Sequence, residues 1–227
     1  MQIKTYTLHE GDDLQSIVAS GADHVLLDFR PSSPNFLTMI STHAGIIPDR
    51  GSLSTLTDSC LPQRVGVFVD EMPQNVITRV VNFQLNLIQL HGHETPTYIR
   101  NLRRTLDPDI SPGIRFIKAI SVSSRDDIAA NKDYADCVDY FLFDTKCKTV
   151  GGSGEQFDWS VLEAYDGDIP FLLSGGIGPD DAERVRNFHH PQCIGIDLNS
   201  RFESEPGFKD VAALRQFINQ LNRENVK

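Results

Sequence analysis

The sequence is poor in cysteine, and the few cysteines it has are scattered. Cys60, Cys137, Cys147 and Cys193 form no C-x-x-C pair anywhere in the 227 residues. Because that spacing is the usual sign of a zinc cluster or a redox dithiol, we expect neither, and no metal site. The opening segment also lacks a basic stretch followed by an apolar one, which argues against a secretory signal. We therefore expect a cytoplasmic protein with reduced thiols.

Long apolar runs and an excess of positive charge are also absent. No window approaches the roughly 18 consecutive apolar residues of a membrane span, so we expect no membrane partner. The 21 lysines and arginines are outnumbered by 31 aspartates and glutamates, which gives a formal net charge of −10. An acidic chain has no overall positive field to attract nucleic acid. Any anionic ligand must therefore be held locally, by backbone N–H groups in glycine turns and at helix N-termini.

What the sequence does contain is a regular alternation of short apolar runs and segments of helical period. The apolar runs predict eight strands, at residues 3–7, 24–29, 64–69, 85–90, 114–120, 139–144, 170–174 and 193–199. The helical period predicts helices at residues 12–20, 73–83, 96–106, 125–132, 159–165, 180–188 and 207–222. No linker-like tract interrupts them, so we predict one domain over residues 1–227, an α/β fold closed into a single (β/α)8 TIM barrel. An open doubly wound sheet is the alternative.

A glycine-rich turn gives the strongest indication of a binding site. In "FLLSGGIGPDDA" an apolar strand ends at Ser174 and passes through Gly175 and Gly176 to a helix start at Pro179. Small residues let the backbone approach a ligand closely, and the first turn of a helix offers unpaired N–H donors. The pattern predicts an anion site, with an ordinary glycine turn as the alternative.

The next predicted strand ends in three short polar side chains, Asp197, Asn199 and Ser200. In TIM barrels the loops after the seventh and eighth strands frequently bind one phosphate group together. We therefore assign a phosphate to Gly175, Gly176, Asn199 and Ser200. Asp197 is expected to contact a sugar hydroxyl or to order the loop.

A single carboxylate, Asp144, ends the sixth apolar run and precedes a segment rich in glycine. The end of a barrel strand lies at the mouth where the active sites of such barrels are found. A carboxyl group there acts as a general acid or base if partial burial raises its pKa. A helix cap, or a salt bridge to Lys146 or Lys148, is the alternative.

Five segments, in order, resemble the phosphoribosylanthranilate isomerases of tryptophan biosynthesis. They are "VGVFV" (65–69), "LIQLHG" (87–92), "FDT…GGSGEQFDW" (143–159), "LLSGGIGPDDA" (172–182) and "GIDLNSRFE…PGFKD" (195–210). The resemblance covers the chain from Val65 to its end. It implies a barrel enzyme that acts on a small phosphorylated substrate by an Amadori rearrangement, without a cofactor or metal.

The resemblance also implies roles for individual residues. The family reaction opens an aminated ribose ring and removes a proton from C2′, giving an enol that becomes a ketone, so it needs a general acid and a general base. The family's acid matches Asp144, and its phosphate loops match those already assigned. Gln89, His91 and Asp197 are expected to contact the substrate, although a histidine that ends a barrel strand is equally one held by backbone hydrogen bonds.

Two departures from the family pattern fall before Val65. The family opens with Lys-x-Cys-Gly, whose cysteine is the base, whereas this chain has Tyr6 at that position, two residues after Lys4. A phenol with a reference pKa near 10 is a poor base at neutral pH. Asp28, a charge inside an apolar run, is therefore a second candidate for the base.

The other departure concerns the substrate carboxylate. The arginine of the family's Ser-Pro-Arg is replaced by Asn35, and Arg30, five residues earlier, is the candidate to reach across. Together the departures leave open a silent or repurposed paralogue that binds a phosphorylated sugar-like metabolite or a protein partner. Either a monomer or a homodimer is compatible with the sequence.

Overall fold

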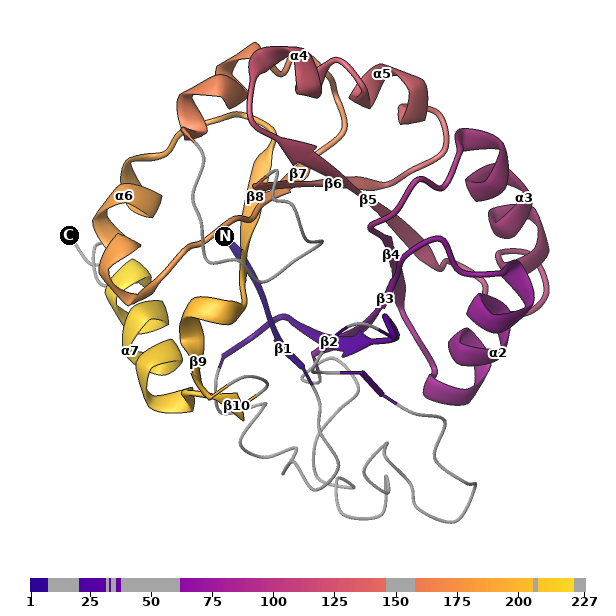
Figure 1. Cartoon of the computed structure of the whole chain (residues 1–227), viewed down its shortest axis with the longest axis horizontal. Helices are drawn as coiled ribbons and strands as arrows, with labels where there is room; N and C mark the ends of the chain where they lie inside the picture. The colour runs from indigo at the N-terminus through magenta and orange to yellow at the C-terminus, as the bar shows by residue number, and fades with distance from the viewer. Residues whose placement is uncertain are drawn as a thin grey trace.

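The computed structural model describes residues 1–7, 21–31, 33, 36–37, 62–145, 158–205 and 208–222, with the side chains of residues 5–7 excepted. Its centre is a closed barrel of parallel strands, in which β8 pairs back onto β1 (Figure 1). The strands are β1 (Gln2–Thr7), β2 (His24–Asp28), β3 (Gln63–Phe68), β4 (Leu87–Leu90), β5 (Arg115–Val122), β6 (Tyr140–Thr145), β7 (Phe171–Leu173) and β8 (Cys193–Leu198). The predicted barrel is confirmed, and the open sheet is wrong.

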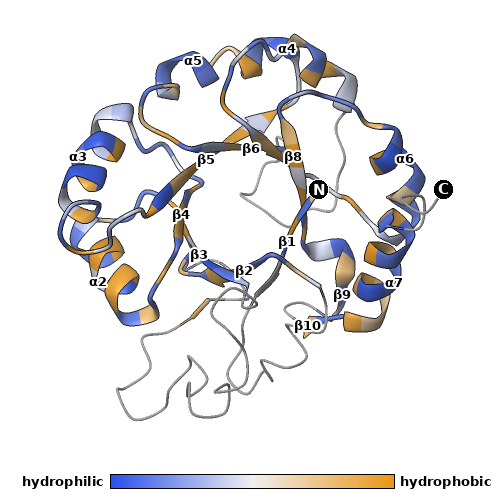
Figure 2. Ribbon diagram, turned by 180° about the vertical axis from the view of Figure 1, so that it is seen from behind, coloured by the Kyte–Doolittle hydropathy of each residue, from blue (hydrophilic) through white to orange (hydrophobic). Residues whose placement is uncertain are grey.

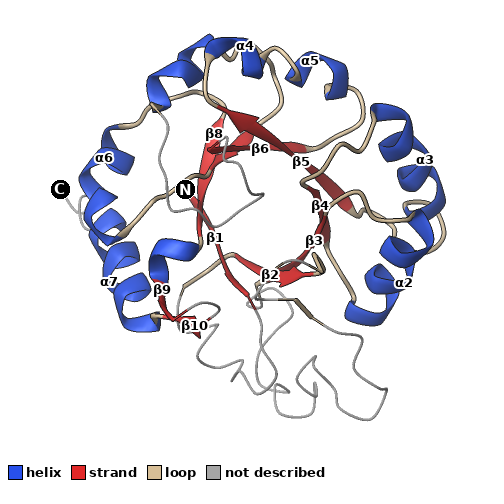
Figure 3. Cartoon of the chain, in the orientation of Figure 1, coloured by secondary structure: helices blue, strands red, loops and turns tan. Residues whose placement is uncertain are grey.

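Helices surround the barrel (Figure 3). They are α2 (Pro73–Phe83), α3 (Pro96–Leu106), α4 (Arg125–Ile128), α5 (Asn131–Tyr134), α6 (Ala182–Asn187) and α7 (Val211–Asn222), with 3-10 turns η3 (Trp159–Ala164), η4 (Pro179–Asp181) and η5 (Ser200–Phe202). Both α2 and α3 have the predicted bounds, because a proline occupies the first turn and one apolar face is buried. Among the described residues, none of the helices combines the length and the apolar character needed to cross a bilayer.

Two predicted helices are each divided into two shorter elements. The helix expected at residues 125–132 is two short helices, because the Asn131 side chain donates to the Ile128 carbonyl at 2.6 Å and competes with the helical hydrogen bond. The helix expected at residues 180–188 begins as η4 and continues as α6. The helix expected at residues 12–20 lies outside the described residues.

Two further expectations near the C-terminal half differ in the structure. The segment 159–165 forms a 3-10 turn, whose N-terminus is capped by Asp158 accepting from Ser160 N. The last helix begins at Val211 rather than at residue 207, because β10 (Phe208–Lys209) pairs with β9 (Glu203–Glu205) in an antiparallel hairpin. Asp210 then caps α7 by accepting from Ala213 N at 2.9 Å.

The barrel strands separate two apolar layers. One layer lies between strands and helices, and Figure 2 shows that the surrounding helices carry both hydrophobic and hydrophilic residues. The other fills the barrel interior and consists of Val65, Leu87, Ile117, Ala119, Leu142 and Leu172. Because side chains alternate along a strand, residues two positions further on face the same interior, nearer the mouth. Gln89 and Asp144 stand in that relation to Leu87 and Leu142.

Candidate active site

A row of polar side chains crosses four neighbouring strands at the mouth of the barrel. Asp144 near the end of β6 accepts from Ser174, the residue after β7, and Ser174 Oγ also lies 3.4 Å from Asp197 Oδ2 on β8. Lys4 Nζ on β1 lies 2.9 Å from the same Asp197 oxygen. Lys4 and Asp197 are buried. The structure therefore joins the predicted Asp144 and Asp197 through Ser174 and places Lys4 beside Asp197, and sequence reasoning assigned a role to neither Ser174 nor Lys4.

The environment of Asp144 favours its protonated form. Burial is the main cause that raises the pKa of its carboxyl group, and the negative charge of Asp197 raises it further. Thr145 N donates to Oδ1 at 2.9 Å, and His91 Nε2 lies 3.5 Å from Oδ2. A carboxyl group with a raised pKa keeps more of its proton near neutral pH, which suits a general acid.

His91 lies directly after β4 with its ring toward Asp144. Its backbone N–H donates to the Phe68 carbonyl at 2.8 Å, which is the backbone hydrogen bonding that one of the two interpretations of His91 predicted. The ring nevertheless also reaches the mouth, beside Asp144. Burial, followed by the positive charges of Arg30 and Lys4, lowers the pKa of His91 to about 3. The imidazole is therefore neutral near pH 7 and meets Asp144 as a hydrogen-bonding group rather than as a cation.

Asp28 and Arg30 form an ion pair on the opposite side of the barrel mouth from Asp144. Asp28 is buried and Arg30 is partly buried. Asp28 ends β2, which lies four positions round the eight-stranded barrel from β6. Arg30 donates from Nε to Asp28 Oδ1 at 2.8 Å and from Nη2 to Oδ2 at 2.5 Å, and Ser33 Oγ donates to Oδ2 at 2.6 Å. This is the bidentate geometry typical of arginine and carboxylate.

The charge of Arg30 acts across the mouth. Burial disfavours its charged form, but the hydrogen bonds and charge of Asp28, followed by the charges of Asp144 and Asp197, raise the pKa of Arg30 above its ordinary value. The guanidinium of Arg30 therefore lies within electrostatic reach of both carboxylates on the far strands.

Three buried polar atoms of the described residues at this end of the barrel make no hydrogen bond within the protein. They are Gln89 Oε1, Asp197 Oδ1 and Lys4 Nζ, the last of which is ion-paired. Buried polar groups nearly always have partners, so atoms of this kind suit the hydroxyl groups of a polar ligand.

The two predicted phosphate loops lie side by side. Gly175 and Gly176 have φ angles of 97° and 64°, in the left-handed region that favours glycine. Arg201, in the η5 turn that begins at Ser200, donates from Nη1 to the Gly176 carbonyl at 3.1 Å. The loops after β7 and β8 are thus tied together, as a shared phosphate site requires.

The helix start after the glycine turn contributes less than the sequence predicts. Gly178 N donates to Asp181 Oδ2 at 2.7 Å, and Asp181 N donates to the Gly178 carbonyl at 3.0 Å. These two donors are therefore engaged in the cap, and Asp180 and Asp181 place negative charge in the first turn. The prediction of an anion site therefore rests on Gly175 and Gly176 and on the loop after β8 rather than on this helix start.

Some predicted site residues lie outside the described part of the chain. Asn35 and the glycines at 151, 152 and 154 are among them, and Tyr6 is described only through its backbone in β1. The structure adds Lys4 and Ser174 to the site, and the sequence indicated these two residues only weakly. Lys4 is the one charged residue in the predicted strand at residues 3–7. Ser174 is the polar residue that ends an apolar run.

Fold and site together define a TIM-barrel enzyme with carboxylate, lysine and histidine side chains at the mouth and the glycine loop after β7 beside them. The family model described as N-(5'phosphoribosyl)anthranilate (PRA) isomerase matches residues 3–220. An N-(5'-phosphoribosyl)anthranilate isomerase from Parabacteroides distasonis is 38% identical over 221 residues, which are 97% of this chain and 93% of that protein.

Two solved structures show the same architecture. Phosphoribosyl anthranilate isomerase from Thermus thermophilus superposes with a TM-score of 0.75 at 26% identity, covering 98% of this chain and 99% of that one. A phosphoribosyl anthranilate isomerase in complex with reduced 1-(o-carboxyphenylamino)-1-deoxyribulose 5-phosphate gives a TM-score of 0.71 at 27% identity, with coverage of 98% and 99%. The chain belongs to the phosphoribosylanthranilate isomerase family. It is an isomerase of tryptophan biosynthesis, as the resemblance implied.

Proposed function

We propose that Asp144 is the general acid and Asp28 the general base in the isomerisation of N-(5'-phosphoribosyl)anthranilate to the carboxyphenylamino-deoxyribulose phosphate. The observation that carries this proposal is the position of the two carboxylates on β6 and β2, four strands apart round the ring. A substrate lying between them meets an acid on one side and a base on the other, which is the arrangement the reaction needs.

In the first step Asp144 gives its proton to the ribose ring oxygen. The bond between that oxygen and C1′ breaks, and the lone pair of the anthranilate nitrogen forms a C=N bond, so the ring opens to a cationic imine. Burial raises the pKa of Asp144, which favours the protonated carboxyl group that this step needs. The neutral His91 ring, with Nε2 3.5 Å from Oδ2, lies beside the carboxyl group without adding a positive charge.

In the second step a base removes the proton from C2′. The electrons of the C–H bond form a C=C bond, the C=N electrons return to nitrogen, and the resulting enol tautomerises to the ketone. Asp28 is the base in this proposal, and its present partner is Arg30. When the substrate carboxylate binds Arg30 in place of Asp28, the Asp28 carboxylate is released from its present partner and can meet C2′ of the substrate. Substrate binding therefore prepares the base.

The remaining site residues position the substrate. Gly175, Gly176, Asn199 and Ser200 hold the phosphate, supported by the left-handed glycines and by the Arg201 bridge between the loops. Gln89 and Asp197 bind sugar hydroxyls through the oxygen atoms that have no partner among the described residues. The proposal uses no metal or cofactor. The cytoplasmic location and the choice between monomer and homodimer stay predictions.

The proposal is tested by turnover of N-(5'-phosphoribosyl)anthranilate by the purified protein, followed by substrate fluorescence. We expect conversion by the parent, a loss of about 10²- to 10⁴-fold in kcat for Asp28→Asn, and a change within about threefold for Tyr6→Phe. The reverse order of the two variants would identify Tyr6 as the base. A parent that converts no substrate above background, and fails to support growth of a tryptophan auxotroph, would instead favour the silent paralogue.

A further inference from the structure

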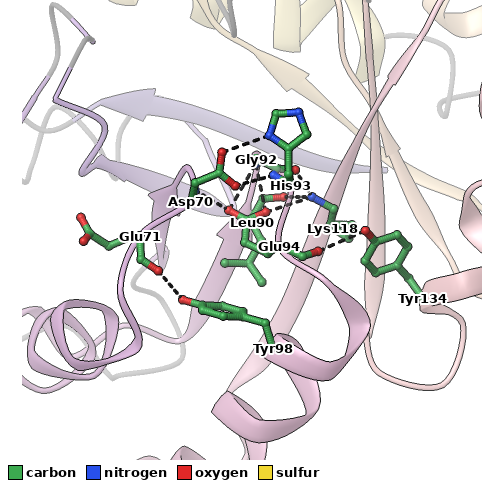
Figure 4. Close-up of polar contacts among 9 residues, drawn as sticks. All are labelled: Asp70, Glu71, Leu90, Gly92, His93, Glu94, Tyr98, Lys118 and Tyr134. Carbon is green, nitrogen blue, oxygen red and sulfur yellow. Dashed lines mark hydrogen bonds and ion pairs between the residues drawn. The ribbon is translucent and has the colours of Figure 1, made fainter.

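A buried ion pair lies behind the barrel wall, close to His91 in the chain but outside the mouth. Lys118 on β5 and Glu94, four residues after β4, join at 3.0 Å between Nζ and Oε2 (Figure 4), with 4% and 1% of their side chains exposed. The neighbours of Lys118 in β5, Ile117 and Ala119, belong to the interior cluster. Lys118 therefore faces the helix layer, and none of the steps above uses it.

Lys118 binds the backbone on both sides of His91. Its Nζ donates to the Gly92 carbonyl at 2.5 Å and lies 3.4 Å from the Leu90 carbonyl. The two carbonyls belong to the residues that precede and follow His91. One ammonium group therefore fixes the direction of the chain through the residue that faces Asp144.

Glu94 binds the same segment through backbone N–H groups, whereas Lys118 binds it through carbonyl groups. Its Oε2 accepts from Gly92 N at 3.0 Å, and its Oε1 accepts from Asp70 N at 2.9 Å in the loop after β3 (Figure 4). A Cβ atom at Gly92 would lie 2.7 Å from Asp70 N, so the close packing of the two loops requires glycine. The segment 90–94 is thus bonded to β5 and to the β3 loop at once.

A buried ion pair of this kind is weak as a source of stability. Desolvation of two charges offsets much of their attraction, and replacement of such a pair by apolar residues is often neutral. The polar contacts of this pair with the backbone of Leu90 and Gly92, on either side of His91, point to a different use, which is to hold geometry. Groups that orient a metal ligand from behind typically change affinity or activity by about 10- to 100-fold when they are removed. We take the same range for a group that orients His91.

We propose that the Lys118–Glu94 pair is a positioning device that fixes the backbone of residues 90–92 and thereby holds the His91 ring against Asp144. The inference rests on the proposed function, in which Asp144 is the acid. His91 Nε2 lies 3.5 Å from Asp144 Oδ2, at the outer limit of hydrogen-bond distance, so a small displacement of the His91 backbone would separate the two groups.

The test is Lys118→Met, measured by kinetics and by ¹⁵N NMR of the His91 ring, with His91→Asn to assign the signal. We expect kcat to fall about 10- to 100-fold. We expect KM to change by less than about threefold, because the phosphate loops lie on other strands, after β7 and β8. The ¹⁵N shifts of His91 are expected to move toward those of a ring that exchanges between tautomers.

Arg103→Met is the matched control. Arg103 forms a half-buried ion pair with Asp139 at 2.6 Å and stacks over Phe116 of the same strand, β5, without a contact to residues 90–94 among those described. It is expected to lower thermal stability while leaving kcat and the His91 signal unchanged. A stability loss alone therefore does not imitate the predicted effect.

The double variant Glu94→Gln/Lys118→Met guards against a misfolded single variant, since it leaves no unpaired buried charge. We expect it to fold and to show the same fall in kcat and the same His91 shifts. A folded double variant with parental kcat and parental ¹⁵N shifts would overturn the inference. If the parent itself is inactive, the proposed function fails, while the His91 signal still decides whether the pair positions the ring.

Discussion

Arg30 extends from the end of β2 into the mouth, where it is paired with Asp28 and acts on Asp144 and Asp197. The family's arginine would stand at position 35, which holds asparagine here. In the proposed function the guanidinium of Arg30, five residues earlier in the chain, supplies that cation.

We predict that Arg30→Met raises KM for N-(5'-phosphoribosyl)anthranilate by about 10- to 100-fold, which corresponds to the loss of a charge-assisted contact worth about 1.5–3 kcal/mol. Steady-state kinetics give the value. Adding Asn35→Arg to that variant is expected to recover most of the affinity. An unchanged KM in Arg30→Met would show that another group binds the carboxylate.

Single residues at strand ends were the most predictable part of the site. Asp144 and Gly175 could be predicted because a charge or a glycine at the end of an apolar run adds nothing to the strand itself and lies at the barrel mouth. Glu94 and Lys118 could not, because they are 24 residues apart and the pairing exists only through tertiary contact. The period of β5 shows only that residue 118 faces away from the interior.

At the scale of elements, the loop after β7 is held against the end of β6 by a close backbone approach. Gly175 has a positive φ, and a Cβ atom there would overlap the Thr145 hydroxyl and lie 2.9 Å from Thr145 N. Because Thr145 follows Asp144 directly, the proposed phosphate loop and the proposed acid share one packing contact. Movement of one element is therefore expected to disturb the other.

We predict that Gly175→Ala raises KM about tenfold and lowers the free energy of unfolding by roughly 1–3 kcal/mol, since alanine would strain the left-handed backbone and overlap with Thr145. Gly113→Ala is the control, because Gly113 has a φ of 78° but no atom within 4 Å of the place a Cβ atom would take. It is expected to lose about 1 kcal/mol with an unchanged KM. Steady-state kinetics and thermal unfolding measure both variants, and an equal change in KM for the two would argue against a phosphate loop at Gly175.

Element boundaries were predictable where local chemistry sets them. The proline starts and apolar faces of α2 and α3 led to the observed bounds. The predicted start of α7 was wrong because Phe208 and Lys209 pair with β9 instead, and a two-residue strand leaves no periodicity to read. The break between α4 and α5 depends on one side-chain hydrogen bond from Asn131.

At the scale of the whole molecule, closure of the barrel is what brings the site together. The eight runs were visible in the sequence, but only the pairing of β1 with β8, Lys4 beside Asp197, closes the ring and completes the polar row. Closure also places β2 opposite β6. The acid, the candidate base and the phosphate loops therefore face one mouth although they come from both halves of the chain.

The central claim is the proposal that Asp144, whose carboxyl pKa is raised by burial, is the general acid at the mouth of the barrel. The direct measurement is the pH dependence of kcat/KM for the parent, for Asp144→Asn, and for Asp136→Asn, which changes an exposed carboxylate paired with Arg100. We predict that parental kcat/KM falls as pH rises through a pKa above the ordinary 3.8, since the acid must carry its proton. Asp144→Asn is expected to lose about 10²- to 10⁴-fold in kcat/KM together with that limb, while Asp136→Asn keeps both. An Asp144→Asn protein with parental activity and a parental pH profile would contradict the claim.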